Sequence, residues 1–380
     1  MGTTNDAIQM VIDEQVAQGR QIGVQVAAYQ HGRPIVSCVA GQMGPHDSRP
    51  VQNDTLFCSF STTKGIAALA LHQQIAKGLI DPEVPVAAYW PAFAANGKGA
   101  ITVAQAMSHQ AGLHALPSPT LHRHLTDWEA GLRLIEQGTP AWEPGTATGY
   151  HAVTYAWIVG GIVAGATGRH IHDVIRDDIA KPLGLGDELF VSVPVQDAAV
   201  RERLATLHIV PAGDGLPIPD DSPFYEAMPK SIWPYFNDMS VREACLPSAN
   251  GHFSARALAR VYGTLANGGE VDGTRLIAAD YIPQMQRIQI HEVDRVLMSP
   301  IRKGIGFFMG GPGPTPDGRM VDGALGPRDT AFGHSGAGGS VAFADPEIGL
   351  GVGITLNKMS YPMPGEGVTV EIANAIRAAL

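Results

Sequence analysis

The order in which strand-like and helix-like patterns occur constrains this fold more than any other feature of the sequence. Residues 23–40 alternate in polarity around a turn at 30–33, which predicts a β-hairpin near the N-terminus. The other main strands are predicted near the opposite end of the 380 residues, at 305–309, 340–344 and 350–356. The stretches with helical spacing or composition are 7–18, 61–77, 103–107, 126–137, 152–166, 171–179, 255–267 and 369–380.

Strands at both ends and helices between them predict an α/β (α+β) protein in which both termini build one sheet domain. We expect residues 1–60 and 290–380 to form that domain, and residues 61–289 to form an inserted, mostly helical domain. The proline-rich stretch 207–250 carries several aromatic residues and is predicted to be a long loop, either a packed cover or a substrate wall. The cleft between the two domains is the expected place for chemistry.

Composition excludes several classes of partner. The chain is 45% hydrophobic and 16% charged, as folded proteins usually are, and its formal net charge is −10. This charge, without a Lys/Arg cluster, argues against nucleic acid and anionic membranes as partners. Three cysteines far apart suit a reducing compartment, and no secretory or membrane-spanning segment is found. We therefore expect a cytoplasmic protein, although a chain that has lost a leader would look the same.

The tetrad Ser-Thr-Thr-Lys at 61–64 is the strongest sign of chemistry. It lies where a short predicted strand, 55–58, runs into an Ala/Leu-rich helix. Positions i and i+3 share a helix face, so Lys64 can reach the hydroxyl of Ser61. The unpaired N–H groups of the first turn disfavour a charged lysine and favour a developing oxyanion. Ser61 is therefore predicted to be a nucleophile that attacks an acyl carbon.

Tyr150 is the natural third member of this site. It follows a turn at 143–146, and its phenol has an ordinary pKa close to that of a lysine ammonium. A Lys64/Tyr150 pair that shares a proton titrates as a unit and needs a smaller shift in either group. We assign the two jointly as general base and acid. Which of them takes the proton of Ser61 is left open by the sequence.

A third segment, His334-Ser335-Gly336, opens a glycine-rich run that leads into a predicted strand. Glycines let this backbone approach a substrate closely. An oxyanion hole needs two convergent donors, and the backbone N–H groups of Ser61 and Ala337 are the candidates. We expect His334, Ser335 and Gly336 to contact substrate, with His334 donating a hydrogen bond on the leaving-group side.

Three other segments could carry a nucleophile or a companion motif. Residues 333–337 nearly match the elbow G-x-S-x-G around Ser335, but they lead into a strand and not a helix. Residues 248–250 (Ser-Ala-Asn) resemble S-D-N and are expected to cap the helix beginning near 255. Cys58 is read as a small buried apolar residue.

The histidines give no metal site. The pairs 122/124 and 170/172 have suitable spacing, but no Asp, Glu or Cys cluster accompanies either pair. His109 is expected to stabilise a helix–loop junction. Neither a metal nor a cofactor is predicted.

Together these motifs resemble the serine β-lactamase-like superfamily, specifically the class C β-lactamase branch and the family VIII carboxylesterases. The resemblance covers nearly the whole chain: 60–64 looks like the family's first motif, Tyr150 its tyrosine motif and 334–336 its third. Further similar segments are 108–113, 142–146, 182–185, 333–339 and 345–346. The resemblance implies a β-lactamase/transpeptidase-like fold, an antiparallel sheet flanked by helices. It also implies the roles given above for Ser61, Lys64, Tyr150 and Ala337.

Two departures from the lactamase pattern favour an esterase. Ala152 stands where lactamases usually carry an asparagine, and His334 stands where they usually carry a lysine that binds a carboxylate. We therefore predict a serine carboxylesterase that hydrolyses small-molecule esters through an acyl-enzyme. Alternatives are a β-lactamase, peptidase, amidase or acyltransferase using the same site. A non-catalytic binding or scaffold protein is disfavoured by the complete set of motifs. The sequence leaves the oligomeric state open.

Overall fold

A nine-stranded sheet joins the two ends of the chain. The computed structural model describes residues 3–210, 218–314, 320–362 and 365–380. The sheet order is β3-β2-β1-β16-β15-β14-β11-β10-β9 and every pairing in it is antiparallel. Its strands are β1 (Gly23–Gln30), β2 (Arg33–Gly44), β3 (Asp47–Pro50), β9 (Ile290–Val293), β10 (Pro300–Lys303), β11 (Phe308–Met309), β14 (Phe332–Ser335), β15 (Val341–Asp345) and β16 (Leu350–Leu356). The predicted fold class is confirmed.

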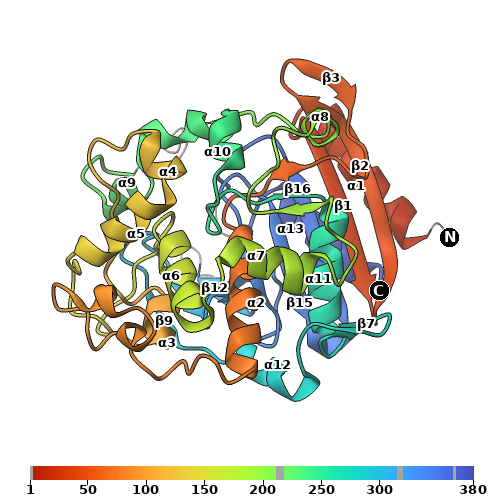
Figure 1. The fold of residues 1–380 in the computed structure, drawn as a ribbon. Coiled ribbons are helices and arrows are strands. Elements are labelled where there is room, and N and C mark those ends of the chain that lie inside the picture. The colour runs from red at the N-terminus through yellow and green to blue at the C-terminus, as the bar shows by residue number, and fades with distance from the viewer. Residues whose placement is uncertain (1–2, 211–217, 315–319, 363–364) are drawn as a thin grey trace.

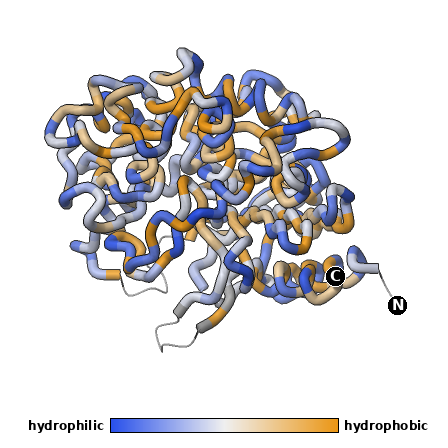
Figure 2. Tube along the Cα trace, turned by 90° about the horizontal axis from the view of Figure 1, so that it is seen from below, coloured by the Kyte–Doolittle hydropathy of each residue, from blue (hydrophilic) through white to orange (hydrophobic). Residues whose placement is uncertain are grey.

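Both faces of the central strands are covered, which explains why β16 is buried throughout and, except for Thr355, apolar. On one face, α1 (Thr4–Ala17) and α13 (Val368–Ala378) pack on Val24 and Val26. On the other, α11 (Ala255–Ala266) lies over β1, β15 and β16. A Cβ at Gly351 would lie 2.0 Å from the nitrogen of Gly263, so glycine permits this close approach. The two termini lie close together, with Thr4 Oγ1 donating to the carbonyl of Ala379 (Figure 2).

Most of the helices from the middle of the chain form the other side of the molecule (Figure 1). Its central pair is α2 (Thr63–Ala76) and α6 (Tyr155–Thr167), both rich in Ala or Gly and buried along most of their length. The other helices are α3 (Val103–Met107), α4 (Arg123–Thr126), α5 (Trp128–Gln137), α7 (Ile171–Ile175), α8 (Ala198–Glu202), α9 (Pro223–Ala227), α10 (Met239–Glu243) and α12 (Ile282–Met285). Short strands outside the large sheet are β4 (Phe57–Cys58), β5 (Leu189–Phe190), β6 (His252–Phe253), β7 (Glu270–Val271), β8 (Thr274–Arg275), β12 (Pro312–Pro314) and β13 (Met320–Asp322).

Four local expectations differ from the structure. The helix α11, expected within the inserted helical domain, packs on the sheet because its Ala- and Gly-rich face fits the glycines of β16. The strand expected at 305–309 is reduced to β11, since a turn precedes Phe308. The described parts of 207–250 contain α9, a 3₁₀ helix (Lys230–Asn237) and α10, and residues 211–217 of that stretch lie outside the described residues. The cap of α11 is Ser254 and not 248–250, because the Ser254 side chain accepts from Ala257 N.

Candidate active site

Ser61 lies at the sharp turn between β4 and α2. Phe60, just before it, has a φ of 45°, a left-handed conformation that non-glycine residues rarely adopt. The chain thereby leaves β4 and enters α2 within a few residues, with Ser61 two positions before the first helical residue. Ser61 as a whole residue is only 9% exposed. A strained residue beside a candidate nucleophile is the kind of place where functional sites concentrate.

Lys64 is fully buried one turn further on and points back at Ser61. Its Nζ lies 3.2 Å from Ser61 Oγ, 2.6 Å from the carbonyl of Ala152 and 2.9 Å from the carbonyl of Ser248. Among the described residues no carboxylate pairs with Lys64, and burial holds the pKa of its amine well below the ordinary value. A neutral amine that donates its two N–H groups to the two carbonyls has its lone pair left for the Ser61 hydroxyl.

Tyr150 completes the group of three. Lys64 Nζ lies 4.7 Å from the centre of the Tyr150 ring. Burial raises the pKa of the Tyr150 phenol, although a hydrogen bond with Ser61 acts in the opposite direction. The sequence predicts two groups of similar pKa that share a proton. In the structure burial instead moves the two pKa values apart, because it lowers that of the Lys64 amine and raises that of the Tyr150 phenol.

The backbone around Tyr150 is held from two sides. On one side, His109 O accepts from Gly149 N at 3.0 Å and His109 Nδ1 accepts from His151 N at 3.1 Å. On the other side, Asp294 Oδ1 accepts from Tyr150 N at 3.1 Å. His109 therefore connects the end of α3 to the Tyr150 segment. Asp294 belongs to no motif that the sequence displays.

The glycine-rich segment after β14 lies against the Ser61 turn. A Cβ at Gly336 would be 2.2 Å from the carbonyl oxygen of Ser59, so only glycine fits there. Thr62 Oγ1 also donates to the carbonyl of Ser340 at 3.2 Å. In the described part of the chain, neither Ser61 N–H nor Ala337 N–H has a hydrogen-bond acceptor. Both donors are thus available to an oxyanion.

His334 takes up a different role from the expected one. Its Nδ1 lies 2.7 Å from the carbonyl of Ser335 and must donate to it, and its buried Nε2 has no partner among the described residues. Burial lowers the pKa of His334 to about 3, and Lys64 adds to the shift. A neutral imidazole in this tautomer has no second N–H. The expectation that His334 donates a hydrogen bond to substrate therefore does not fit this geometry, and Nε2 is an acceptor.

Aromatic residues from the 207–250 stretch pack on Phe60, next to Ser61. The ring of Phe60 lies 5.8 Å from that of Trp233 and 4.9 Å from that of Phe236, centre to centre. Phe308, on the strand β11 that pairs with β14, stacks on His334 with the ring centres 4.2 Å apart. Apolar rings therefore flank both the Ser61 turn and His334.

The remaining candidate side chains supply neither a metal site nor a second nucleophile in the described chain. In the described ranges no group of three or more His, Cys, Asp or Glu side chains could hold a metal ion. Cys58 is buried, and burial raises the pKa of its thiol to about 11. Ser248 contributes its carbonyl to Lys64, while its hydroxyl donates to the carbonyl of Val153 at 2.8 Å. Within the described ranges no helix combines the length and the apolar character needed to cross a bilayer.

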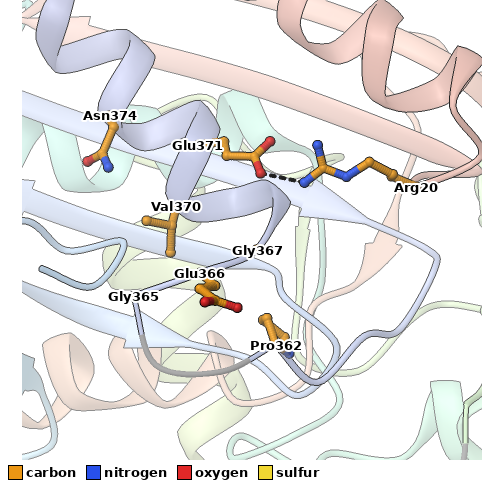
Figure 3. A pocket seen from close by; sticks show the side chains of 8 residues that line it. All are labelled: Arg20, Pro362, Gly365, Glu366, Gly367, Val370, Glu371 and Asn374. Atoms are coloured by element: carbon orange, nitrogen blue, oxygen red, sulfur yellow. Dashed lines mark hydrogen bonds and ion pairs between the residues drawn. The ribbon is translucent and has the colours of Figure 1, made fainter. Parts of the chain in front are cut away.

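A pocket of about 510 Å³ at the start of α13 also lies away from Ser61 (Figure 3). Its described lining includes the ion pair of Arg20 with Glu371, and further Glu366 and Asn374. None of the described lining residues is a serine, cysteine, lysine or tyrosine. This pocket therefore has no nucleophile and no amine base.

The chain is similar to known proteins along nearly all of its length. Residues 8–376 match the family described as Beta-lactamase. Esterase/beta-lactamase LipL of Mycobacterium tuberculosis (strain ATCC 25618 / H37Rv) is 33% identical over 359 residues, which cover 91% of this chain and 79% of LipL. The crystal structure of a family VIII carboxylesterase superposes with a TM-score of 0.87 at 33% identity, covering 100% of this chain and 99% of the other. A penicillin-binding protein homolog from Caulobacter crescentus gives 0.85 at 34% identity, with the same coverage.

Proposed function

Since this chain belongs to the beta-lactamase family, we propose that it is a serine carboxylesterase that hydrolyses small-molecule esters through an acyl-enzyme on Ser61. One observation carries the proposal: the buried Lys64 Nζ lies 3.2 Å from Ser61 Oγ, while two backbone carbonyls accept its N–H groups. This is the arrangement of a nucleophile with a neutral base already aimed at its proton. Neither a metal nor a cofactor takes part in the proposed reaction.

In the acylation step, the Lys64 amine takes the proton of Ser61 as Oγ bonds to the ester carbon. The negative charge on the former carbonyl oxygen is stabilised by the N–H groups of Ser61 and Ala337. The bond to the leaving alcohol then breaks, and Tyr150 protonates that oxygen. The Lys64 ammonium then passes the proton that it took from Ser61 to Tyr150, so the alcohol leaves with the proton of Tyr150 and both groups return to their starting states.

Deacylation repeats these steps with water in place of the alcohol. The Lys64/Tyr150 pair removes a proton from the water as its oxygen attacks the acyl carbon. Ser61 Oγ leaves as the acid is released and is protonated by the same pair.

The surroundings of the site favour a neutral ester over a β-lactam. The Ala152 side chain offers no amide to bind an acylamino group, and its carbonyl already accepts from Lys64. Burial keeps His334 uncharged at neutral pH, so it cannot pair with a carboxylate. Lys303, a cation near Tyr150, already forms an ion pair with Asp294. No strong site for an anionic substrate group is therefore expected here.

Covalent labelling tests the nucleophile. A p-nitrophenyl phosphonate should add one phosphonyl group per chain, and peptide mass mapping should find it on Ser61. The Ser61→Ala variant should lose the adduct and about 10³-fold or more of its turnover of p-nitrophenyl acetate. Ser37→Ala, on an exposed part of β2, is the matched control and should keep both. An adduct on Ser335 would overturn the assignment.

A second candidate function is β-lactam or amide cleavage by the same acyl-enzyme. It is raised by the similarity to LipL, whose name includes beta-lactamase, and to a penicillin-binding protein homolog. The uncharged His334 and the apolar Ala152 predict that nitrocefin is hydrolysed far more slowly than p-nitrophenyl acetate. Comparable rates for the two substrates would favour this second function.

A further inference from the structure

A buried ion pair lies directly beside the backbone of Tyr150. Lys303 Nζ is 2.5 Å from Asp294 Oδ2, and the two side chains are 1% and 0% exposed. Building on the catalytic role proposed for Tyr150, we infer that Asp294, held by Lys303, is a positioning residue. Its carboxylate fixes the Tyr150 backbone and thereby the place of the phenol against Ser61 and Lys64.

Both oxygens of the Asp294 carboxylate have partners. Its Oδ1 accepts from Tyr150 N at 3.1 Å, Val296 N at 2.8 Å and Leu297 N at 2.7 Å, while Oδ2 pairs with Lys303. Hydrogen bonds to an ionised acceptor are shorter and stronger than neutral ones. One side chain thus ties the Tyr150 backbone to the turn that follows β9, and Lys303 prevents that side chain from rotating away.

A second connection joins the same two segments. Lys303 Nζ donates to Thr148 Oγ1 at 2.6 Å, and Arg295 N donates to the carbonyl of Thr148 at 2.9 Å. The turn itself is closed by Asp294 N donating to Ser299 O at 3.0 Å. The β9–β10 connection therefore holds Thr148 and Tyr150 from one side.

The segment 149–151 depends on these contacts because it is not part of a helix, whose own hydrogen bonds would fix its backbone. The helix α6 begins only at Tyr155, five positions after Tyr150. The N–H groups of Gly149 and His151 go to His109, and that of Tyr150 goes to Asp294. Alternate N–H groups thus point to opposite supports, and the loss of either support frees the phenol to shift. A displacement of about 1 Å in an active site can cost about 100-fold in rate.

Stability alone gives a weak reason for this ion pair. Replacing a buried pair by apolar side chains of similar volume is often neutral or stabilising, because two charges no longer need to be desolvated. A function in positioning Tyr150 does explain it, since an apolar residue at 294 offers no acceptor for the Tyr150 N–H. Asp294 also raises the pKa of the Tyr150 phenol, which helps to keep it protonated.

Two double variants separate charge from positioning. Asp294→Asn/Lys303→Met removes both charges but keeps a side-chain oxygen for the Tyr150 N–H. Asp294→Leu/Lys303→Met removes the charges and the acceptor. With p-nitrophenyl acetate, we expect the Asn variant to keep kcat within about fivefold of wild type. The Leu variant should lose about 10- to 100-fold in kcat with little change in KM. Equal kcat values for the two variants would overturn the inference.

A double-mutant cycle with Tyr150→Phe shows whether the effect acts through the phenol. If Asp294 positions Tyr150, the Leu double variant should lower kcat no more than about twofold further in the Tyr150→Phe background. Lys98→Met, which removes a buried lysine that bonds to three backbone carbonyls elsewhere, is the control for general destabilisation. Lys98→Met should change kcat by the same factor in wild type and in Tyr150→Phe.

The outcomes distinguish a failure of the positioning role of Asp294 from a failure of the proposed function. If Tyr150→Phe lowers kcat but the Leu double variant lowers it by the same factor in both backgrounds, the positioning role is wrong and the proposed function stands. If Tyr150→Phe leaves kcat unchanged, the proposed role of Tyr150 fails, and the inference fails with it. Should the Leu variant not fold, Asp294→Ser/Lys303→Met takes its place in the same cycle, since its side chain is too short to reach Tyr150 N.

Discussion

Two of the fully buried lysines, Lys64 and Lys303, lie near Tyr150, and a carboxylate contacts only one of them in the described chain. Lys64, in α2, is surrounded by two backbone carbonyls and the hydroxyl of Ser61. Lys303, at the end of β10, has Thr148 Oγ1 and the carboxylate of Asp294. A carboxylate therefore compensates the charge of Lys303, while none in the described chain compensates that of Lys64.

This difference separates a reactive group from an anchoring one. Burial lowers the pKa of both amines, but Asp294 opposes the shift at Lys303 and no charge opposes it at Lys64. The first amine is therefore suited to accept a proton, and the second to keep one and hold its partner in place. We therefore expect the same residue type to serve the proposed reaction in one region and to hold the Tyr150 segment in place in the other.

The largest expected effect is on activity at Lys64. Lys64→Met removes the proposed general base and should lower kcat for p-nitrophenyl acetate by about 10³- to 10⁴-fold, or about 4–5.5 kcal/mol in the barrier. The melting temperature should stay the same or rise, because an uncompensated buried amine is replaced by an apolar side chain of similar length. A stable variant that keeps most of its kcat would break the distinction between the two lysines.

At Lys303 we expect the main effect to be on folding stability. Lys303→Met leaves the Asp294 carboxylate buried without a counter-charge, which should cost about 3–5 kcal/mol of folding stability. Denaturant unfolding measures this loss, and adding Asp294→Asn should restore most of it. A Lys303→Met protein as stable as the Lys64→Met protein would show that Lys303 is not an ionic anchor.

A smaller effect is expected from the neutral partner of Lys303. Thr148→Val removes a buried acceptor from a charged donor and should cost about 2 kcal/mol of stability. Thr264→Val in α11 is the matched control: it removes a hydroxyl that donates to the carbonyl of Arg260 at 2.8 Å, a neutral hydrogen bond that contributes about 1 kcal/mol. Equal losses in the two variants would argue that Lys303 carries no charge.

The parts of this site that follow local rules can be predicted from the sequence. The spacing of Ser61 and Lys64 on a helix start is visible without any coordinates, and strand patterns at both ends of the chain predict the shared sheet. The acceptors that tune Lys64 are different, because the carbonyls of Ala152 and Ser248 belong to the backbone and have no residue type to recognise.

Long-range partners are equally hidden in one sequence. Asp294 lies 144 positions from Tyr150, and no motif links them. The tautomer of His334 is determined by the local carbonyl of Ser335, which only the fold of the turn reveals. The position of α11 depends on glycines in β16, whose role is to admit a neighbouring backbone and not to form a pattern.

The smallest expected effect is on the way in which the free energy of unfolding changes with pH. One experiment compares this pH dependence for the two lysines. The folded protein holds Lys64 neutral above its lowered pKa, whereas an unfolded lysine stays charged up to about pH 10.4. Unfolding between those two values takes up a proton, so raising the pH should stabilise wild type relative to Lys64→Met, by at most about 1.4 kcal/mol per pH unit. The matched difference between wild type and Asp294→Asn/Lys303→Met should rise less steeply, because Asp294 helps Lys303 to keep its proton. Denaturant unfolding at pH 7, 8 and 9 measures both slopes. If the Lys64 difference is flat while the Lys303 difference rises, then Lys64 is the charged lysine and Tyr150, not Lys64, must take the proton of Ser61.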